Sequence, residues 1–217
     1  MNIKLELVDI PEIIRIDSDS GRMYKTPEGN LYPSVSTVLG KGIPNPWIDE
    51  WRKKVGDKVA NEISKRATDR GTLIHTNIEN TILGKPLTFN MFQRDDQKMY
   101  EQVLPVLNDI TIVRGLETQM WSDKLRLAGT VDCIAVHNGK LKCIDWKTSG
   151  HYKHRDEIHS YFMQTAAYSM MFWERTGHAI ADILICMVTP DDGLLLFEEK
   201  VKDWLGEFIK VRALVDD

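Results

Sequence analysis

The pattern of apolar and polar positions changes near residue 109. Before this point the spacing is typical of helices, in two or three pieces over residues 45–85 and in another over 90–109. After it the pattern becomes that of short strands. Residues 110–121, 127–136 and 141–147 are predicted to form a three-stranded antiparallel meander.

The rest of the chain continues with a helix, two strands and a closing helix. We expect a helix over 155–177 that Gly177 can stop, strands over 179–188 and 194–201, and an amphipathic helix over 203–215. The order helix, three strands, helix, strand predicts an α/β (α+β) fold in which helices flank a central mixed β-sheet.

The pattern of predicted helices and strands divides the chain into three segments. Three segments are expected: a β-like and irregular segment over 1–44, a helical lobe over 45–109, and a core with a closing helix over 110–217. The stretch "PSVSTVLG" is predicted to open an irregular piece. Gly56 and Gly71 are predicted to interrupt the helical lobe, and Pro105 to kink or end its last helix.

A tight turn fixes the register of the second and third strands of the meander. Asn138-Gly139 is the preferred pair for a two-residue turn in which both residues have positive φ. A loop closing at His137 and Lys140 pairs residues whose numbers sum to 277, which places Asp132 opposite Asp145. Cβ atoms of such a pair lie about 4.5–5.5 Å apart, and like charges placed there destabilise a sheet.

Two readings of this acidic pair remain open. Lys147 projects on the same face as Asp145, so the three residues could form a charged sheet face of an interaction protein. Apolar neighbours on both strands, such as Ile134 and Ile144, instead suggest a strand pair covered on both sides. In that setting a divalent cation would remove the repulsion, and Lys147 would assist chemistry beside it.

Glu117 depends on a turn that the sequence does not fix. If residues 122–125 close a two-residue loop, Glu117 lies opposite Thr130 and on the same face as Asp132. A three-residue loop would turn it to the other face. A role in binding a cation or positioning water therefore depends on the length of this loop.

Composition narrows the range of functions. The chain has 217 residues with 28 Lys and Arg against 32 Asp and Glu, a formal net charge of −4. The absence of a global basic field counts against a DNA-coating protein, but an enzyme with a local basic path and an acidic centre remains open.

The three cysteines, at 133, 143 and 186, show no CxxC spacing and are predicted to be core residues, so that no iron–sulfur cluster or structural zinc is indicated. The first 21 residues are too acidic for a signal or transit peptide, and the chain lacks an apolar run of membrane-spanning length. We expect a cytoplasmic protein, without a membrane partner, from a bacterium or a phage-infected host.

Several motifs resemble those of one nuclease family. "GTVD" followed by "IDWKTS" is similar to the PD-(D/E)XK signature, "RGTLIHTNIE" to the helical histidine motif of its RecB-like branch, and "YFMQTAAY" to the Gln-x-x-x-Tyr motif. With "YPSVSTVL", the pattern resembles most the mitochondrial genome maintenance exonucleases and their bacteriophage relatives, over residues 24–190. It departs from the iron–sulfur enzymes of this branch because their four cluster cysteines are absent.

The resemblance implies a restriction-endonuclease-like core and roles for particular residues. Asp132, Asp145, His75 and the Trp146 carbonyl would hold one or two Mg²⁺ or Mn²⁺ ions, with Lys147 and Glu117 beside them as catalytic groups. A lone helical histidine is more often structural, and the hairpin together with the resemblance favours the ligand role of His75. Glu79, one turn later on the same helix face, is a weaker candidate. Gln164 and Tyr168 would approach the active site or the DNA.

The activity implied is a metal-dependent exonuclease acting on single-stranded DNA with free ends. Two alternatives stay open: a duplex exonuclease of the lambda type that serves recombination, and a catalytically silent DNA-binding module of the same fold. Trp47 and Trp51, one turn apart, are predicted to pack in the core, with base stacking as the alternative. The run Arg52-Lys53-Lys54 with Lys58, Lys65, Arg66 and Arg70 is either a solvated face or a phosphate-tracking surface.

Overall fold

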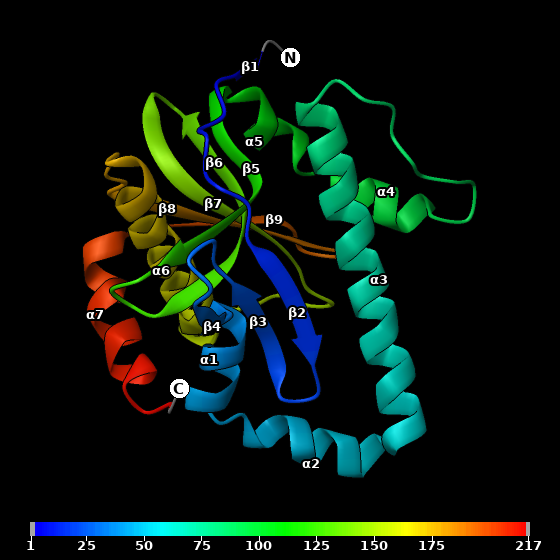
Figure 1. Cartoon of the computed structure of the whole chain (residues 1–217). Coiled ribbons are helices and arrows are strands. Elements are labelled where there is room, and N and C mark those ends of the chain that lie inside the picture. The colour runs from blue at the N-terminus through cyan, green and yellow to red at the C-terminus, as the bar shows by residue number, and fades with distance from the viewer. Residues whose placement is uncertain (1–2, 216–217) are drawn as a thin grey trace.

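A mixed six-stranded sheet forms the centre of the protein in a computed structural model that describes residues 3–215 (Figure 1). Its order is β1-β5-β6-β7-β8-β9. The strands are β1 (Lys4–Leu5), β5 (Ile110–Ser122), β6 (Leu127–His137), β7 (Lys140–Thr148), β8 (Asp182–Thr189) and β9 (Gly193–Lys200). β1 is parallel to β5 and β7 to β8, whereas the other neighbours are antiparallel. The predicted fold class is confirmed.

The predicted register of the β6–β7 hairpin is confirmed. Asn138 and Gly139 have φ values of 49° and 74°, as this two-residue turn requires. The ladder runs from His137–Lys140 to Cys133–Ile144, and every pair sums to 277. Asp132 and Asp145 therefore stand one position beyond the last paired residues, where the hairpin strands stop exchanging ladder hydrogen bonds.

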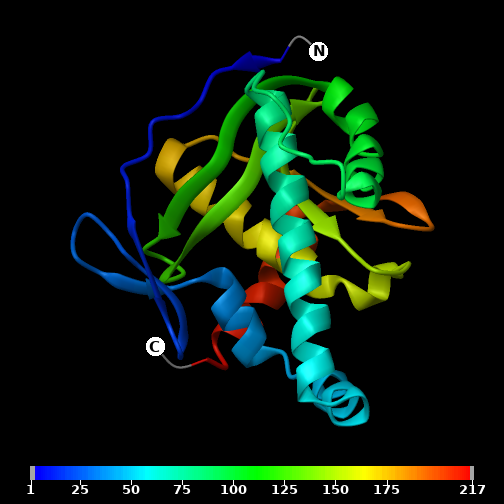
Figure 2. The ribbon, with the colours of Figure 1, turned by 90° about the vertical axis from the view of Figure 1, so that its right-hand side faces the viewer.

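Helices cover both faces of this sheet (Figures 1 and 2). The helices are α1 (Val35–Gly42), α2 (Pro46–Val55), α3 (Asp57–Ile82), α4 (Arg94–Glu101), α5 (Leu104–Asn108), α6 (His159–Thr176) and α7 (Val201–Arg212), with a 3₁₀ turn at Arg155–Glu157. Helices α1, α6 and α7 share one core cluster with Ile183, Ile185 and Met187 of β8. Helices α3, α4 and α5 share the other with Leu184, Cys186 and Val188. The alternation along β8 shows how one apolar strand serves two cores.

All three cysteines lie in these cores. Cys133, Cys143 and Cys186 are free thiols with at most 1% exposure. Burial raises the pKa of each thiol, so that each behaves as a small apolar residue. The prediction that they are core residues is confirmed.

Two local predictions before the meander are wrong. Residues 35–42 form helix α1 where an irregular stretch was expected, because the Ser34 hydroxyl caps the helix by accepting a hydrogen bond from the Thr37 amide at 3.0 Å. Gly71 lies inside α3 and does not interrupt it. Gly56, with φ of 84°, does separate α2 from α3, and Pro105 stands in the first turn of α5 after α4 has ended.

Helix α2 and the first half of α3 extend away from the sheet layers (Figures 1 and 2). Every residue of α2 is at least partly exposed, and Trp47 is 75% exposed. The predicted core packing is therefore wrong for Trp47. We call residues 46–70 the arm. The second half of α3 is anchored differently, because Ile74, Ile78 and Ile82 are buried against the sheet.

A small second sheet is formed by the strands that precede α1. It has the order β2-β3-β4, with β2 (Ile14–Ser18), β3 (Gly21–Lys25) and β4 (Leu31–Pro33). Tyr24 and Tyr32 bury their rings against Trp121 and Ala128 of the main sheet. Among residues 3–215 there is no helix with the length and apolar character needed to span a membrane.

Candidate active site

Three elements bring potential cation ligands together where the β6–β7 ladder ends. His75 comes from α3, Glu117 from β5 and Asp132 from β6, and one ligand atom of each lies within 4.8 Å of the others. The His75 Nδ1 atom is 3.7 Å from the Asp132 Oδ2 atom. Such a set, one imidazole and two carboxylates, is a donor set for a divalent cation.

Asp132 is held in place by the neighbouring strand. Its Oδ2 atom accepts a hydrogen bond from the Trp146 amide at 2.9 Å, directly beyond the last ladder pair of β6 and β7. The side chain thus continues the pairing that the backbone has ended. Because the carboxylate is fixed by main chain, its second oxygen is available to a cation without a loss of order.

Glu117 reaches this group by a register that differs from the predicted one. Ser122 pairs with Leu127, so the loop between β5 and β6 has four residues, 123–126, and pairs sum to 249. Asp132, and not Thr130, is the residue opposite Glu117 in this register. The error amounts to two positions, which preserves the face of the sheet. Glu117 also has a positive φ of 47°.

Glu117 lies in a surrounding that disfavours its negative charge. The residue as a whole is exposed, yet desolvation of its carboxyl raises the pKa to about 7. The negative charges of Asp132, Glu79 and Asp145 act in the same direction. A cation at this point would offset the repulsion among these carboxylates, so the residues present fit a divalent ion.

Asp145 stands apart from the three-residue group and pairs with Lys147. The side chain is almost fully buried, and its Oδ2 atom lies 2.6 Å from Lys147 Nζ. Desolvation raises the pKa of Asp145 to about 6, which outweighs the opposing effect of the ammonium, and the charge of Asp132 adds to the rise. Among the described residues, this oxygen has only the ion pair with Lys147 and no geometrically regular hydrogen bond. It too has capacity for a further positive partner.

Lys147 is enclosed by three side chains. Its Nζ atom lies beside Asp145, donates to Gln164 Oε1 at 3.2 Å, and sits 4.9 Å from the centre of the Tyr161 ring. Burial acts to lower the pKa of Lys147, but the charges of Asp145 and Asp132 outweigh it and raise the pKa. The side chain is therefore an ammonium at neutral pH. It can donate hydrogen bonds, but it cannot accept a proton.

The remaining predicted residues lie around this centre. The Gln164 Nε2 atom donates to the Tyr168 hydroxyl at 3.3 Å, and Tyr168 is only 5% exposed. Glu79 is half-buried on α3 and lies outside the three-residue group. Trp146 is buried and donates through its amide to Asp132, while a ligand role for its carbonyl stays a prediction.

Two residues that contribute to this centre, Tyr161 and Gly129, were not predicted from the sequence to belong to it. Tyr161 belongs to the helical stripe that contains Gln164 and Tyr168, and its spacing is the signal that could have placed its ring against Lys147. Gly129 gives space to the Tyr168 ring, since a Cβ at this position would lie 2.7 Å from Tyr168 Cε1. A glycine in the interior of a strand is a recognised sign of such close approach.

Comparisons with known proteins agree with the motifs. A model of the PD-(D/E)XK nuclease superfamily matches residues 37–203. The chain is similar to mitochondrial genome maintenance exonuclease 1 of Homo sapiens, with 30% identity over 144 residues that cover 61% of this chain and 41% of the human protein. The Mus musculus protein of the same name is 27% identical over 141 residues, with the same two coverages. The match thus spans less than half the length of these relatives.

A likeness to solved structures is also present. The crystal structure of SSO0001 covers 85% of this chain and 76% of that protein, with 13% sequence identity and a TM-score of 0.43.

Proposed function

Because the chain belongs to the PD-(D/E)XK nuclease superfamily, we propose that it hydrolyses phosphodiester bonds of DNA with the help of a divalent cation, Mg²⁺ or Mn²⁺. One observation carries the proposal: a histidine and two carboxylates gather within 4.8 Å, next to the Asp145–Lys147 ion pair. The raised pKa of Glu117 adds weight, since it marks negative charge that a cation would offset.

Three residues of the chain would hold the cation, and Asp145 would add a fourth ligand, the third carboxylate, from the adjacent strand. His75, Glu117 and Asp132 are the ligands supported by geometry. When bound, a divalent cation lowers the pKa of water and stabilises the charge that develops on phosphate oxygens. The fixed position of Asp132 on the Trp146 amide keeps the site ordered before the cation arrives.

Lys147 would act on the reacting groups as a hydrogen-bond donor. An ammonium has three N–H groups; Gln164 accepts a hydrogen bond from one, and the Asp145 ion pair occupies a second side of the nitrogen. The third remains for the attacking water or for a non-bridging oxygen of the scissile phosphate. The raised pKa of Lys147 supports orientation and charge stabilisation, and it counts against removal of a proton from water by this amine.

For the substrate, we propose single-stranded DNA degraded from a free end. The relatives that the chain resembles are named exonucleases, and the arm offers an exposed aromatic residue in Trp47. Aromatic side chains stack on unpaired bases with little sequence preference. The arm also leads along α3 directly to His75, so a strand held on the arm would reach the proposed centre.

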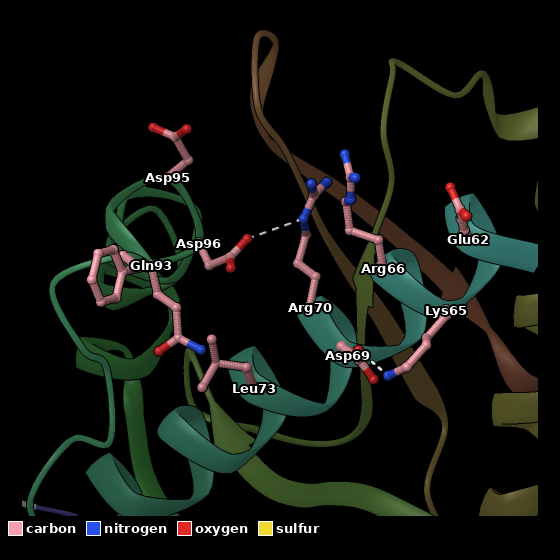
Figure 3. Close-up of a pocket in the computed structure, with 10 residues that line it drawn as sticks. Glu62, Lys65, Arg66, Asp69, Arg70, Leu73, Gln93, Asp95 and Asp96 are labelled. Carbon is pink, nitrogen blue, oxygen red and sulfur yellow. Dashed lines mark hydrogen bonds and ion pairs between the residues drawn. The ribbon is translucent and has the colours of Figure 1, made fainter. Parts of the chain in front are cut away.

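A pocket on the arm narrows the choice of phosphate-binding residues. A cavity of about 620 Å³ lies between α3 and α4 and is lined by Glu62, Lys65, Arg66, Asp69, Arg70, Leu73, Phe92, Gln93, Asp95 and Asp96 (Figure 3). Lys65 is paired with Asp69 at 2.7 Å, and Arg70 with Asp96 at 3.1 Å. Arg66 has no ion pair among the described residues. We therefore favour Arg66 over its two neighbours as a phosphate contact.

A direct assay tests the proposal. End-labelled single-stranded and duplex DNA are incubated with Mg²⁺, with Mn²⁺ or with chelator, and a closed single-stranded circle is included to test the need for an end. We expect cation-dependent shortening of the linear single strand, an intact circle, and loss of cleavage in Lys147→Ala. Faster digestion of duplex would favour the lambda-type alternative, and cutting of the circle would show an endonuclease. DNA binding without cleavage would favour the catalytically silent module.

A further inference from the structure

The Gln164–Tyr168 pair lies behind Lys147, away from solvent. Both residues belong to α6, four positions apart, so they share one helix face. Gln164 is half-buried and bonded to Lys147, whereas Tyr168 is 5% exposed and touches the ammonium only through Gln164. Tyr168 is therefore too buried to serve as a direct contact to DNA.

A chain of contacts leads from Tyr168 to the ion pair. The Tyr168 hydroxyl accepts from Gln164 Nε2 at 3.3 Å, and Gln164 Oε1 accepts from Lys147 Nζ at 3.2 Å. The two ends of an amide differ in charge, and an ammonium tolerates only the oxygen end. With Nε2 donating to the hydroxyl, Oε1 faces Lys147, and turning the amide over would place its N–H groups against the ammonium.

Gly129 makes this arrangement possible. The glycine lies in β6, three positions before Asp132, and is buried under the Tyr168 ring. A Cβ built at Gly129 would lie 2.7 Å from Tyr168 Cε1 and 3.1 Å from its hydroxyl. An aromatic ring cannot yield as a flexible side chain can, so any larger residue would displace the ring from Gln164.

We propose that Tyr168 is a positioning residue for Lys147: its hydroxyl fixes the Gln164 amide, which holds the ammonium beside Asp145, and Gly129 provides the space for its ring. The inference rests on the proposed function, because it assigns Lys147 to the reaction. It goes beyond that function in naming what sets the direction of the one N–H of Lys147 that is left for water or phosphate.

Kinetics of a double-mutant cycle test the proposal. The turnover number kcat and the Michaelis constant KM for end-labelled single-stranded DNA are measured with Mn²⁺ for wild type, Tyr168→Phe, Gln164→Ala and the double variant. Loss of one hydrogen bond of ordinary strength corresponds to roughly tenfold in rate. We expect Tyr168→Phe to lower kcat by about this factor with KM within twofold of wild type, and to have little further effect in the Gln164→Ala background.

Controls separate positioning from packing. Tyr32→Phe removes another buried tyrosine hydroxyl, which bonds Asp123 away from the site, and should keep wild-type kcat. Gly129→Ala should lower kcat like Tyr168→Phe, and if it does not fold the cycle still decides. A wild-type kcat in Tyr168→Phe, a raised KM with unchanged kcat, or effects that multiply in the double variant would each overturn the proposal.

A readout independent of cleavage distinguishes failure of this inference from failure of the proposed function. The Lys147 ammonium signal is observed by NMR and assigned by its loss in Lys147→Ala. An ammonium held by two acceptors should exchange slowly with water, and the signal should broaden or shift in Tyr168→Phe but not in Tyr32→Phe. If wild type has no nuclease activity but shows this pattern, the proposed function fails and the positioning role stands. An unchanged signal in Tyr168→Phe overturns it.

Discussion

Replacement of Glu117 by Gln offers a quantitative test of the proposed cation site. The pKa of Glu117 is raised to about 7 without a cation, first by desolvation and then by its acidic neighbours. A cation binds the carboxylate and not the carboxylic acid, so binding must displace the proton that the group carries near neutral pH. Glu117→Gln removes this proton while keeping the size of the side chain.

The expected size of the effect follows from that pKa. With a pKa of about 7, protonation of Glu117 reduces apparent cation affinity roughly elevenfold at pH 6, about twofold at pH 7 and hardly at pH 8. Affinity should therefore rise about tenfold between pH 6 and pH 8 on account of this group alone. At pH 7, about half a proton should be released for each cation bound.

Calorimetric titration with Mn²⁺ measures both quantities. Titrations of the DNA-free protein at pH 6, 7 and 8 give the affinity, and two buffers with different ionisation enthalpies give the number of protons released. Glu117→Gln should bind more weakly at pH 8 and lose the roughly tenfold dependence. The difference between the two proteins isolates Glu117 from every other titrating group of the site.

Two results would refute the reasoning. Equal pH dependence in wild type and Glu117→Gln would show that this carboxyl does not exchange its proton for a cation. Absence of any stoichiometric Mn²⁺ site at pH 8 in wild type would remove the cation itself, and the acidic group would then be a charged sheet face.

Four further outcomes are expected. Lys147→Ala should remain folded by circular dichroism, because the freed Asp145 carboxyl can take up a proton, and should lose cleavage; wild-type activity would exclude the lysine from the reaction. Asp132→Asn keeps an acceptor for the backbone amide and should lose Mn²⁺ binding in calorimetry at nearly unchanged unfolding free energy, whereas Asp132→Ala should cost about 1–3 kcal/mol more in urea denaturation. The pKa values of Glu117 and Asp145 are raised above their unfolded values, so these groups favour folding most below pH 4 and lose that contribution as pH rises through about 6 and 7. The melting temperature of the cation-free protein should therefore fall as pH rises through this range and should recover when Mn²⁺ is added. A melting temperature that does not change with pH would contradict the raised pKa values. Trp47→Ala should leave the melting temperature unchanged and weaken single-strand binding by about 1–3 kcal/mol in a fluorescence titration, and equal binding would exclude base stacking by this residue.

The sequence predicted the hairpin of β6 and β7 well because its register depends on one turn of known chemistry. Asn138-Gly139 permits a two-residue loop, and the position of Asp132 relative to Asp145 follows by counting. The turn between β5 and β6 carries no such pair, and its four-residue loop moved the partner of Glu117 by two positions. Glu117 nevertheless lies on the predicted face of the sheet, because a shift of two positions leaves a side chain on the same face.

Features that depend on packing between distant parts of the chain could not be predicted from the local sequence pattern. The amphipathic spacing around Trp47 suggests burial, but α2 extends away from the sheet and its apolar side meets solvent. The contact of Gly129 with Tyr168 joins residues 39 positions apart, and only the fold brings them together. Helix α1, in contrast, had a local signal in the cap formed by Ser34, which the pattern of apolar residues alone did not reveal.

Helix α3 is continuous from Asp57 to Ile82, but its two halves have different surroundings. Its last turns pack against the sheet through Ile74, Ile78 and Ile82, whereas most residues of its first turns, which belong to the arm, are exposed to solvent. The helix is roughly 25 Å long from Asp57 to Ile74, at a rise of about 1.5 Å per residue. His75 follows Ile74 directly, so it lies where the exposed part of α3 meets the part buried against the sheet. A ligand bound along the arm would therefore contact the same helix that carries His75 into the proposed cation site.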